Sequence, residues 1–126
     1  MMDSRGVVLV VEDDDSMREA IERLVGAAGY TTAGYTSVEG LLAGDGFDEA
    51  RCIISDITLP AMSGLELIGE LRARGFVTPV ILITAYDSPA VRSEAKLQGA
   101  AAYLAKPFIG SALLRAIDGT VRPARP

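Results

Sequence analysis

Side chains that could act on a phosphate group occur in this sequence where short apolar runs end. They are Glu12, Asp13 and Asp14 after the first run, Asp56 after the third, Thr84 at the end of the fourth and Lys106 after the fifth. Neighbouring carboxylates repel one another unless a cation joins them. Because the chain has no histidine, this set of oxygen ligands favours a hard cation such as Mg²⁺.

Asp56 is the best candidate for a nucleophile in this set. A carboxylate can attack phosphorus and form an aspartyl-phosphate. The negative charge of the carboxylate and of the incoming group must then be offset, which Mg²⁺ and Lys106 can do, while the hydroxyl of Thr84 can hold a phosphoryl oxygen. Apolar residues precede Asp56, and Pro60 and Gly64 follow it, a pattern typical of a buried strand that ends in a loop.

Each of these residues also has an ordinary structural explanation. The acidic run could cap a helix and interact with its dipole. Asp56 could belong to a turn, Thr84 could be satisfied by the backbone and Lys106 could lie in solvent. Their coincidence at four strand ends, rather than on helices, favours a shared site.

The apolar pattern predicts five strands that alternate with five helices. Strands are expected at 7–11, 30–35, 51–55, 79–83 and 101–104. The candidate N-caps of the first four helices are Ser16, Ser37, Ser63 and Ser88. Glu19 and Glu66 stand in capping-box spacing to Ser16 and Ser63, and Pro89 follows Ser88. A last helix carries Leu113, Leu114 and Ile117. This alternation predicts a doubly wound α/β domain, in which ligands bind at the carboxyl ends of the strands.

Composition narrows the class of protein. A length of 126 residues suits one domain, and a net charge of -5 argues against direct nucleic-acid binding, which needs clustered cations. The single cysteine, Cys52, excludes an internal disulfide and is expected in the core. No apolar run is long enough for a membrane span and no signal peptide is evident. We therefore expect a cytoplasmic, single-domain protein or fragment.

Four stretches together resemble the receiver domain of two-component response regulators, most closely receivers of the FixJ type. They are Val10 to Asp14, Asp56 to Gly64, Ile83 to Ala85 and Lys106 to Phe108. The resemblance implies a flavodoxin-like (βα)5 fold with strand order 2-1-3-4-5. Residues 1–126 would form one receiver domain, with 1–6 as a polar lead-in and 121–126 as a tail or the start of a linker.

The resemblance also implies a role for each matching residue. Asp56 corresponds to the phosphorylated aspartate. Glu12 and Asp13 correspond to the acidic pair that binds Mg²⁺, and the backbone carbonyl of Thr58 to a further metal ligand. Thr84 and Lys106 correspond to the phosphoryl-binding hydroxyl and ammonium, and Tyr103 to the aromatic switch. The Lys106–Pro107 peptide bond is often cis in the family. Glu12 departs from the pattern, because aspartate is frequent at that position.

The implied function is signalling rather than enzymatic turnover of a separate substrate. Asp56 would accept a phosphoryl group from a sensor histidine kinase with Mg²⁺, and would lose it by autodephosphorylation. Thr84 would then move inward and Tyr103 would rotate into the vacated space, changing the face formed by the fourth helix, the fifth strand and the fifth helix. An effector domain C-terminal to this chain and a phosphorylation-dependent homodimer would suit that face, without direct contact with nucleic acid or membrane.

Three other functions compete with this one. A phosphate-insensitive interaction module usually lacks the acceptor, the lysine or the acidic pair, all of which are present. An aspartate-nucleophile phosphatase carries its nucleophile after the first strand with a second aspartate two residues later, whereas Asp56 follows the third strand and residue 58 is threonine. A nucleotide-binding fold is disfavoured because neither glycine-rich phosphate motif occurs.

Overall fold

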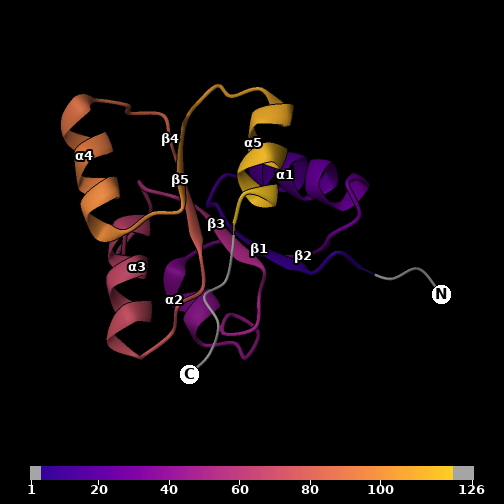
Figure 1. Ribbon diagram of the computed structural model, residues 1–126, viewed down its shortest axis with the longest axis horizontal. Coiled ribbons are helices and arrows are strands. Elements are labelled where there is room, and N and C mark those ends of the chain that lie inside the picture. Colours follow the sequence, from indigo (N-terminus) through magenta and orange to yellow (C-terminus); the bar gives the residue numbers. More distant parts are fainter. Residues whose placement is uncertain (1–3, 121–126) are drawn as a thin grey trace.

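Five short strands, rich in β-branched residues, form a parallel sheet with helices on both faces (Figure 1). The computed structural model describes residues 4–120. The strands are β1 (Val7–Val11), β2 (Thr31–Tyr35), β3 (Cys52–Asp56), β4 (Val80–Thr84) and β5 (Ala102–Ala105). The helices are α1 (Asp15–Ala27), α2 (Val38–Leu42), α3 (Gly64–Ala73), α4 (Pro89–Gln98) and α5 (Gly110–Asp118). The predicted alternation is confirmed, and the observed strand bounds differ from the expected ones by at most one residue at either end.

The strand order is β2-β1-β3-β4-β5, and every adjacent pair is parallel. This confirms the doubly wound, flavodoxin-like order that the family resemblance implied. Because side chains alternate across a strand, the sheet has two apolar faces. Helices α2, α3 and α4 pack on one of them and α1 and α5 on the other (Figure 1).

Burial follows the position of each strand in the sheet. All five residues of the central strand β3 are buried, including Cys52, as predicted. Strand β4 is equally buried, whereas the edge strand β2 contains only exposed and half-buried residues. Continuous apolar runs therefore belong to the strands that are covered on both faces, as expected for a parallel sheet.

The register brings the carboxyl ends of the strands to one edge of the sheet. Val11 pairs with Ser55, Asp56 with Ile83 and Thr84 with Ala105. The ladder continues just past the strands, because the Lys106 N–H donates to the Thr84 carbonyl at 2.7 Å. Residues that follow β1, β3, β4 and β5 therefore share this edge.

Most of the predicted helix caps are confirmed, and one is wrong. Ser37 and Ser88 each accept a hydrogen bond as N-cap, and Ser63 forms a complete capping box with Glu66. The first helix instead begins at Asp15, and its N-cap is Asp14, whose carboxylate accepts from the Met17 N–H at 2.8 Å. Aspartate caps as well as serine does, so the acidic run itself ends the loop two residues before the predicted Ser16.

Two predicted segments lie at the ends of the chain. The lead-in 1–6 is described only from residue 4, and the tail 121–126 lies outside the described residues. Within 4–120, none of the helices has the length and apolar character that a membrane crossing requires.

Candidate functional site

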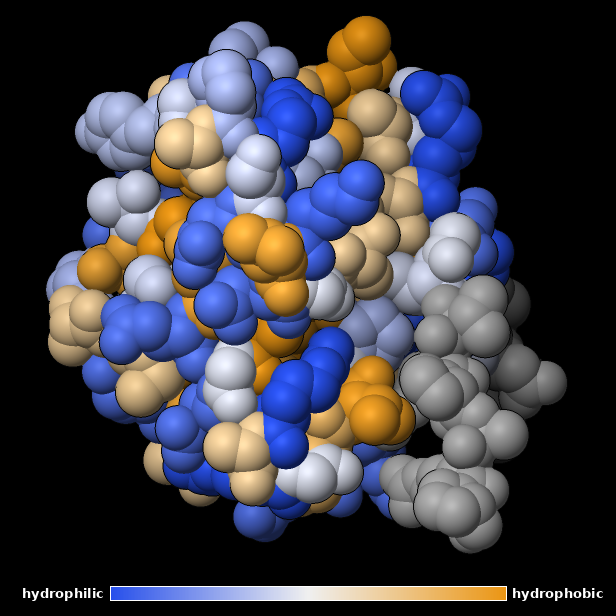
Figure 2. Space-filling model, turned by 60° about the vertical axis from the view of Figure 1, so that its left-hand side comes forward, coloured by the Kyte–Doolittle hydropathy of each residue, from blue (hydrophilic) through white to orange (hydrophobic). Residues whose placement is uncertain are grey.

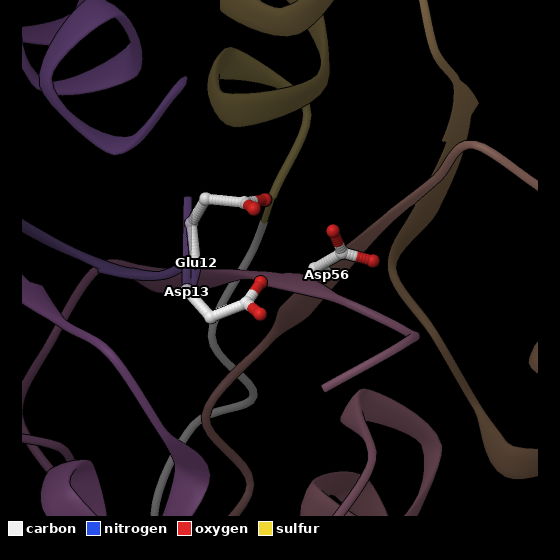
Figure 3. Close-up of side chains that lie close together, drawn as sticks. All are labelled: Glu12, Asp13 and Asp56. Carbon is white, nitrogen blue, oxygen red and sulfur yellow. The ribbon is translucent and has the colours of Figure 1, made fainter. Parts of the chain in front are cut away.

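Three carboxylates converge at the carboxyl edge of the sheet (Figure 3). Glu12 and Asp13 directly follow β1, and Asp56 is the last residue of β3. One oxygen of each lies within 4.8 Å of the others. Glu12 and Asp56 are buried, while Asp13 is exposed. The structure thus brings together the acidic residues that the sequence placed at two strand ends.

This donor set fits a hard divalent cation. All three groups offer oxygen, and the chain contains no histidine to compete. In octahedral coordination around Mg²⁺, ligand oxygens lie roughly 3 to 4 Å apart. The observed span of up to 4.8 Å therefore needs only a small closure or one intervening water.

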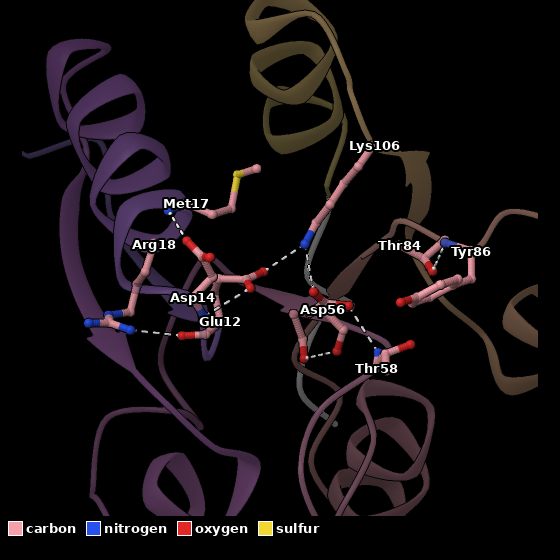
Figure 4. Close-up of polar contacts among 10 residues, drawn as sticks. Glu12, Asp14, Met17, Arg18, Asp56, Thr58, Thr84, Tyr86 and Lys106 are labelled. Atoms are coloured by element: carbon pink, nitrogen blue, oxygen red, sulfur yellow. Dashed lines mark hydrogen bonds and ion pairs between the residues drawn. The ribbon is translucent and has the colours of Figure 1, made fainter.

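Lys106 is the cation that the protein itself supplies to the cluster (Figure 4). Its Nζ lies 2.6 Å from Asp56 Oδ2 and 3.0 Å from Glu12 Oε2, and the side chain is only 16% exposed. If all three acids are ionised, one ammonium leaves two negative charges unbalanced. A bound divalent cation would offset the remainder.

The environment perturbs both partners of the Glu12–Lys106 pair. Burial is the main cause that raises the pKa of the Glu12 carboxyl, and the hydrogen bond from Lys106 opposes it only in part. Burial disfavours the charged form of Lys106, but the bonds and charges of Asp56 and Glu12 outweigh it and raise the pKa of the ammonium. Lys106 therefore stays protonated, and the raised pKa means that the Glu12 carboxylate takes up a proton more readily than an ordinary glutamate.

The Asp56 carboxylate is held from both sides. Lys106 contacts Oδ2, and the backbone N–H of Thr58 donates to Oδ1 at 2.9 Å. The start of α3 lies directly against the backbone of Asp56, because a Cβ on Gly64 would clash with the Asp56 carbonyl. Gly64 is thus required for the close approach of α3 to the candidate nucleophile.

Thr84 enters the site from the neighbouring strand β4. Its side chain is 1% exposed, and its Oγ1 accepts a hydrogen bond from the Tyr86 N–H at 3.0 Å (Figure 4). Among residues 4–120, no acceptor bonds the hydrogen of this hydroxyl. The hydroxyl is therefore available to donate to an oxygen placed beside Asp56.

Tyr103 does not lie in the acidic cluster. Its ring is half-buried on β5, and its hydroxyl donates to Asp87 Oδ1 at 2.9 Å. The Arg92 guanidinium lies 4.6 Å from the ring centroid and pairs with Asp87 at 3.1 Å. These contacts hold the hydroxyl end of Tyr103 at the surface beside α4. The hydrogen bonds from Tyr103 and Arg92 lower the pKa of Asp87.

Two features of the site were missed by sequence reasoning. Arg18 donates to the backbone carbonyl of Glu12, and Asp87 bonds Tyr103 across sixteen residues. A backbone acceptor leaves no trace in the residue types, and the loop that carries Asp87 is placed only by the tertiary fold. The predicted cis Lys106–Pro107 bond is present, and the Thr58 carbonyl stays a predicted metal ligand.

Comparison with known proteins identifies the family to which the chain belongs. The family model described as the response regulator receiver domain matches residues 8–118. The chain is 39% identical to the transcriptional regulatory protein FixJ of Azorhizobium caulinodans over 90% of its own length and 54% of that protein. It is 38% identical to the DNA-binding transcriptional regulator NtrC of Salmonella typhimurium over 82% of the chain and 22% of that protein. The chain thus spans about half the length of the FixJ regulator and less of NtrC.

Solved structures agree with these relatives. The chemotaxis protein CheY4 of Vibrio cholerae superposes with a TM-score of 0.82 at 30% identity, over 91% of this chain and 98% of that one. The structure titled FixJ-N gives a TM-score of 0.81 at 27% identity, over 95% of this chain and 94% of that one. Fold, cluster geometry and family match coincide, and the chain belongs to the receiver domains of two-component response regulators, with FixJ-type receivers among its relatives.

Proposed function

We propose that Asp56 accepts a phosphoryl group from the phosphohistidine of a sensor histidine kinase, in a reaction that requires Mg²⁺. The observation that carries the proposal is the position of Lys106, which bridges Asp56 and Glu12 beside the exposed carboxylate of Asp13. A chain with only an ordinary structural need for these residues would not gather three acids and one largely covered ammonium at the ligand-binding edge of the sheet.

The transfer is a displacement at phosphorus. A carboxylate oxygen of Asp56 forms a bond to the phosphorus while the bond between phosphorus and the imidazole nitrogen breaks, and that nitrogen keeps the electron pair. The product is a mixed anhydride on Asp56. Attack of water on the phosphorus later returns the free carboxylate and inorganic phosphate, so the domain acts as a phosphoacceptor rather than as an enzyme for a separate substrate.

The residues around Asp56 would orient and neutralise the incoming group. Bound Mg²⁺, held by Glu12, Asp13, Asp56 and the Thr58 carbonyl, would supply positive charge for the phosphoryl oxygens. Lys106 already lies 2.6 Å from the acceptor carboxylate and can bond a phosphoryl oxygen. Thr84 can donate its unused hydroxyl hydrogen from the side of β4.

A signal would leave the site through Thr84 and Tyr103. If Thr84 moves toward the phosphoryl group, space opens behind it and the Tyr103 ring can rotate inward after releasing Asp87. Moving such a two-state population from 1:99 to 99:1 needs about 5.5 kcal/mol. Two charge-assisted hydrogen bonds at about 3 kcal/mol each, or three at about 2 kcal/mol each, would supply this free energy.

The output would pass through the face formed by α4, β5 and α5. In the view that turns α3 and α4 forward, apolar residues lie scattered among hydrophilic ones (Figure 2). Leu97 on α4 is 82% exposed. We assign to this face an effector domain C-terminal to the chain, or a second phosphorylated copy, and we place the protein in the cytoplasm beside its kinase. This domain would contact neither nucleic acid nor membrane directly.

The test is chemical phosphorylation read by mass. The protein is incubated with acetyl phosphate and Mg²⁺, and the intact mass is measured with and without EDTA. We expect a gain of one phosphate that depends on Mg²⁺ and disappears in Asp56→Asn, whereas the matched Asp45→Asn variant, in an exposed loop, still gains it. No gain in the native protein, or a gain that survives Asp56→Asn, would overturn the proposal.

A further inference from the structure

We infer that Arg18 and Gly34 form a positioning device for the metal-binding carboxylate of Asp13. The inference rests on the proposed function, because it concerns the Mg²⁺ site beside Asp56. Arg18 touches no reacting atom, and it acts through the peptide bond that joins Glu12 to Asp13.

Arg18 ties the first turn of α1 to the loop that carries the acidic pair. Its Nη1 donates to the Glu12 carbonyl at 2.9 Å (Figure 4). Its Nη2 donates to Asp15 Oδ1 at 2.7 Å. The side chain is only 16% exposed, although Asp15 is largely in solvent. One guanidinium fork thus bridges two anchors in a fixed plane, which a lysine ammonium cannot reproduce.

The Glu12 backbone is held from both sides. Its N–H donates to the Tyr35 carbonyl of β2 at 3.0 Å, and its carbonyl accepts from Arg18. That carbonyl belongs to the same rigid plane as the N–H and the Cα of Asp13. The direction in which Asp13 leaves the strand is therefore set in part by Arg18.

The Asp13 carboxylate lacks a polar partner in the described part of the chain. Among residues 4–120, no group donates a hydrogen bond to its carboxylate, and the residue is exposed. Glu12 and Asp56, in contrast, are each bonded by Lys106 and by a backbone N–H. Of the three acids of the cluster, Asp13 alone relies on its backbone for its position.

Gly34 makes room for this arrangement. Arg18 and Glu22 lie over the middle of β2, and a Cβ on Gly34 would come within 3.0 Å of Arg18 Cδ and 2.7 Å of Glu22 Oε2. The φ angle of Gly34 is not in the left-handed region, so an alanine there would act only through these contacts, and the Glu22 and Arg18 side chains would have to shift. Gly34→Ala should displace Arg18 while every charge is kept.

Loss of the device should weaken Mg²⁺ binding. Groups that orient metal ligands typically contribute 10–100-fold in affinity, and since Asp13 is one of several ligands we expect about 10-fold weaker binding in Arg18→Lys and in Gly34→Ala. The lysine variant keeps the positive charge, so a change in affinity cannot come from altered repulsion of the cation. A role of Arg18 as a charge alone predicts native affinity in Arg18→Lys and tighter binding in Arg18→Met.

The experiment is calorimetric titration of the apoprotein with Mg²⁺. Arg23→Lys, on an exposed part of the same helix, and Gly46→Ala, where a Cβ meets nothing, are the matched controls. Both controls should bind Mg²⁺ like the native protein. Thermal unfolding in EDTA verifies that each variant is folded. If one of the two test variants does not fold, the other still tests the proposal.

Phosphorylation by acetyl phosphate gives a second readout. In both test variants the Mg²⁺ concentration for half-maximal rate should rise about 10-fold, while the rate at saturating Mg²⁺ stays within about 2-fold of native. Native Mg²⁺ affinity in Arg18→Lys and Gly34→Ala would overturn the positioning role. Failure of the native protein itself to bind Mg²⁺ or gain phosphate would instead overturn the proposed function.

Discussion

Replacing Asp13 by asparagine should stabilise the protein without Mg²⁺ and destabilise it relative to native with Mg²⁺. The oxygens of Glu12, Asp13 and Asp56 lie within 4.8 Å of one another. At that separation two unit charges repel by about 0.9 kcal/mol in water and about 3.5 kcal/mol at an effective dielectric constant of 20. Because Asp13 is exposed, the lower value applies to each of its two repulsions.

Attraction between Asp13 and the single charge of Lys106 opposes the two repulsions by about the value of one of them, about 0.9 kcal/mol in water. The net gain from Asp13→Asn in EDTA is therefore about 1 kcal/mol, or roughly 4 °C in melting temperature for a domain of this size. Mg²⁺ at one hundred times its Kd stabilises the native protein by about 2.7 kcal/mol. If the asparagine variant has lost most of its affinity, the order of the two melting temperatures reverses.

The assay is thermal unfolding at low ionic strength, with EDTA or with saturating Mg²⁺, for native protein, Asp13→Asn and the loop control Asp45→Asn. Added salt should shrink the difference in EDTA, because the charges are near the surface. Equal stabilities in EDTA would show that the three acids do not repel as argued. An order that stays the same in Mg²⁺ would show that Asp13 is not a metal ligand.

Three further outcomes are expected. Glu12→Gln should become increasingly more stable than native in EDTA as pH rises above 4.5 through the raised pKa of Glu12. Over that range the native protein loses stability, because the Glu12 carboxyl ionises less readily in the folded than in the unfolded chain. Denaturant titrations at several pH values measure this difference in the free energy of unfolding. Gly64→Ala should lower the free energy of unfolding by about 1–3 kcal/mol, since its Cβ meets the Asp56 carbonyl, and should slow phosphorylation; urea unfolding and intact mass test both effects, and native values for both would contradict the close approach. Tyr103→Phe removes the bond to Asp87 and should increase inward ring population without phosphate, which NMR contacts between ring 103 and the interior would detect; an unchanged ring position would contradict the retention of the ring by Asp87.

Sequence reasoning reached the fold and the acidic cluster for a definite reason. In a parallel sheet the carboxyl ends of the strands must share one edge, so polar residues at four strand ends are brought together by topology alone. The order of the strands was not contained in the alternation and depended on the family resemblance. The pairing of Asp56 with Ile83 beside Thr84 confirms that order at the site.

Hydrogen bonds from side chains to the backbone could not be predicted from the sequence. Arg18 reads as one more charged residue on an amphipathic helix, and only the turn from β1 into α1 places the Glu12 carbonyl in front of it. The same turn explains why the predicted first cap is wrong. Asp14 has an extended backbone conformation and its carboxylate accepts from the Met17 N–H, so the helix begins before Ser16. Residue types predict which groups can bond, but the path of the loop decides which of them meet.

The geometry around Lys106 links the resting and the phosphorylated states of the proposed switch. In the unmodified site the ammonium is shared between Asp56 and Glu12, so it offsets part of the repulsion that would otherwise open the cluster. Phosphorylation would carry negative charge outward from the Asp56 carboxylate, and Lys106 can follow it only by releasing Asp56 Oδ2 and weakening its bond to Glu12. Glu12 would then need another cation, and the exposed side of the cluster, where Asp13 lies, is open to one. A Mg²⁺ ion bound there would have two roles, because it would balance the charge of the phosphoryl group and would also free Lys106 to bind that group.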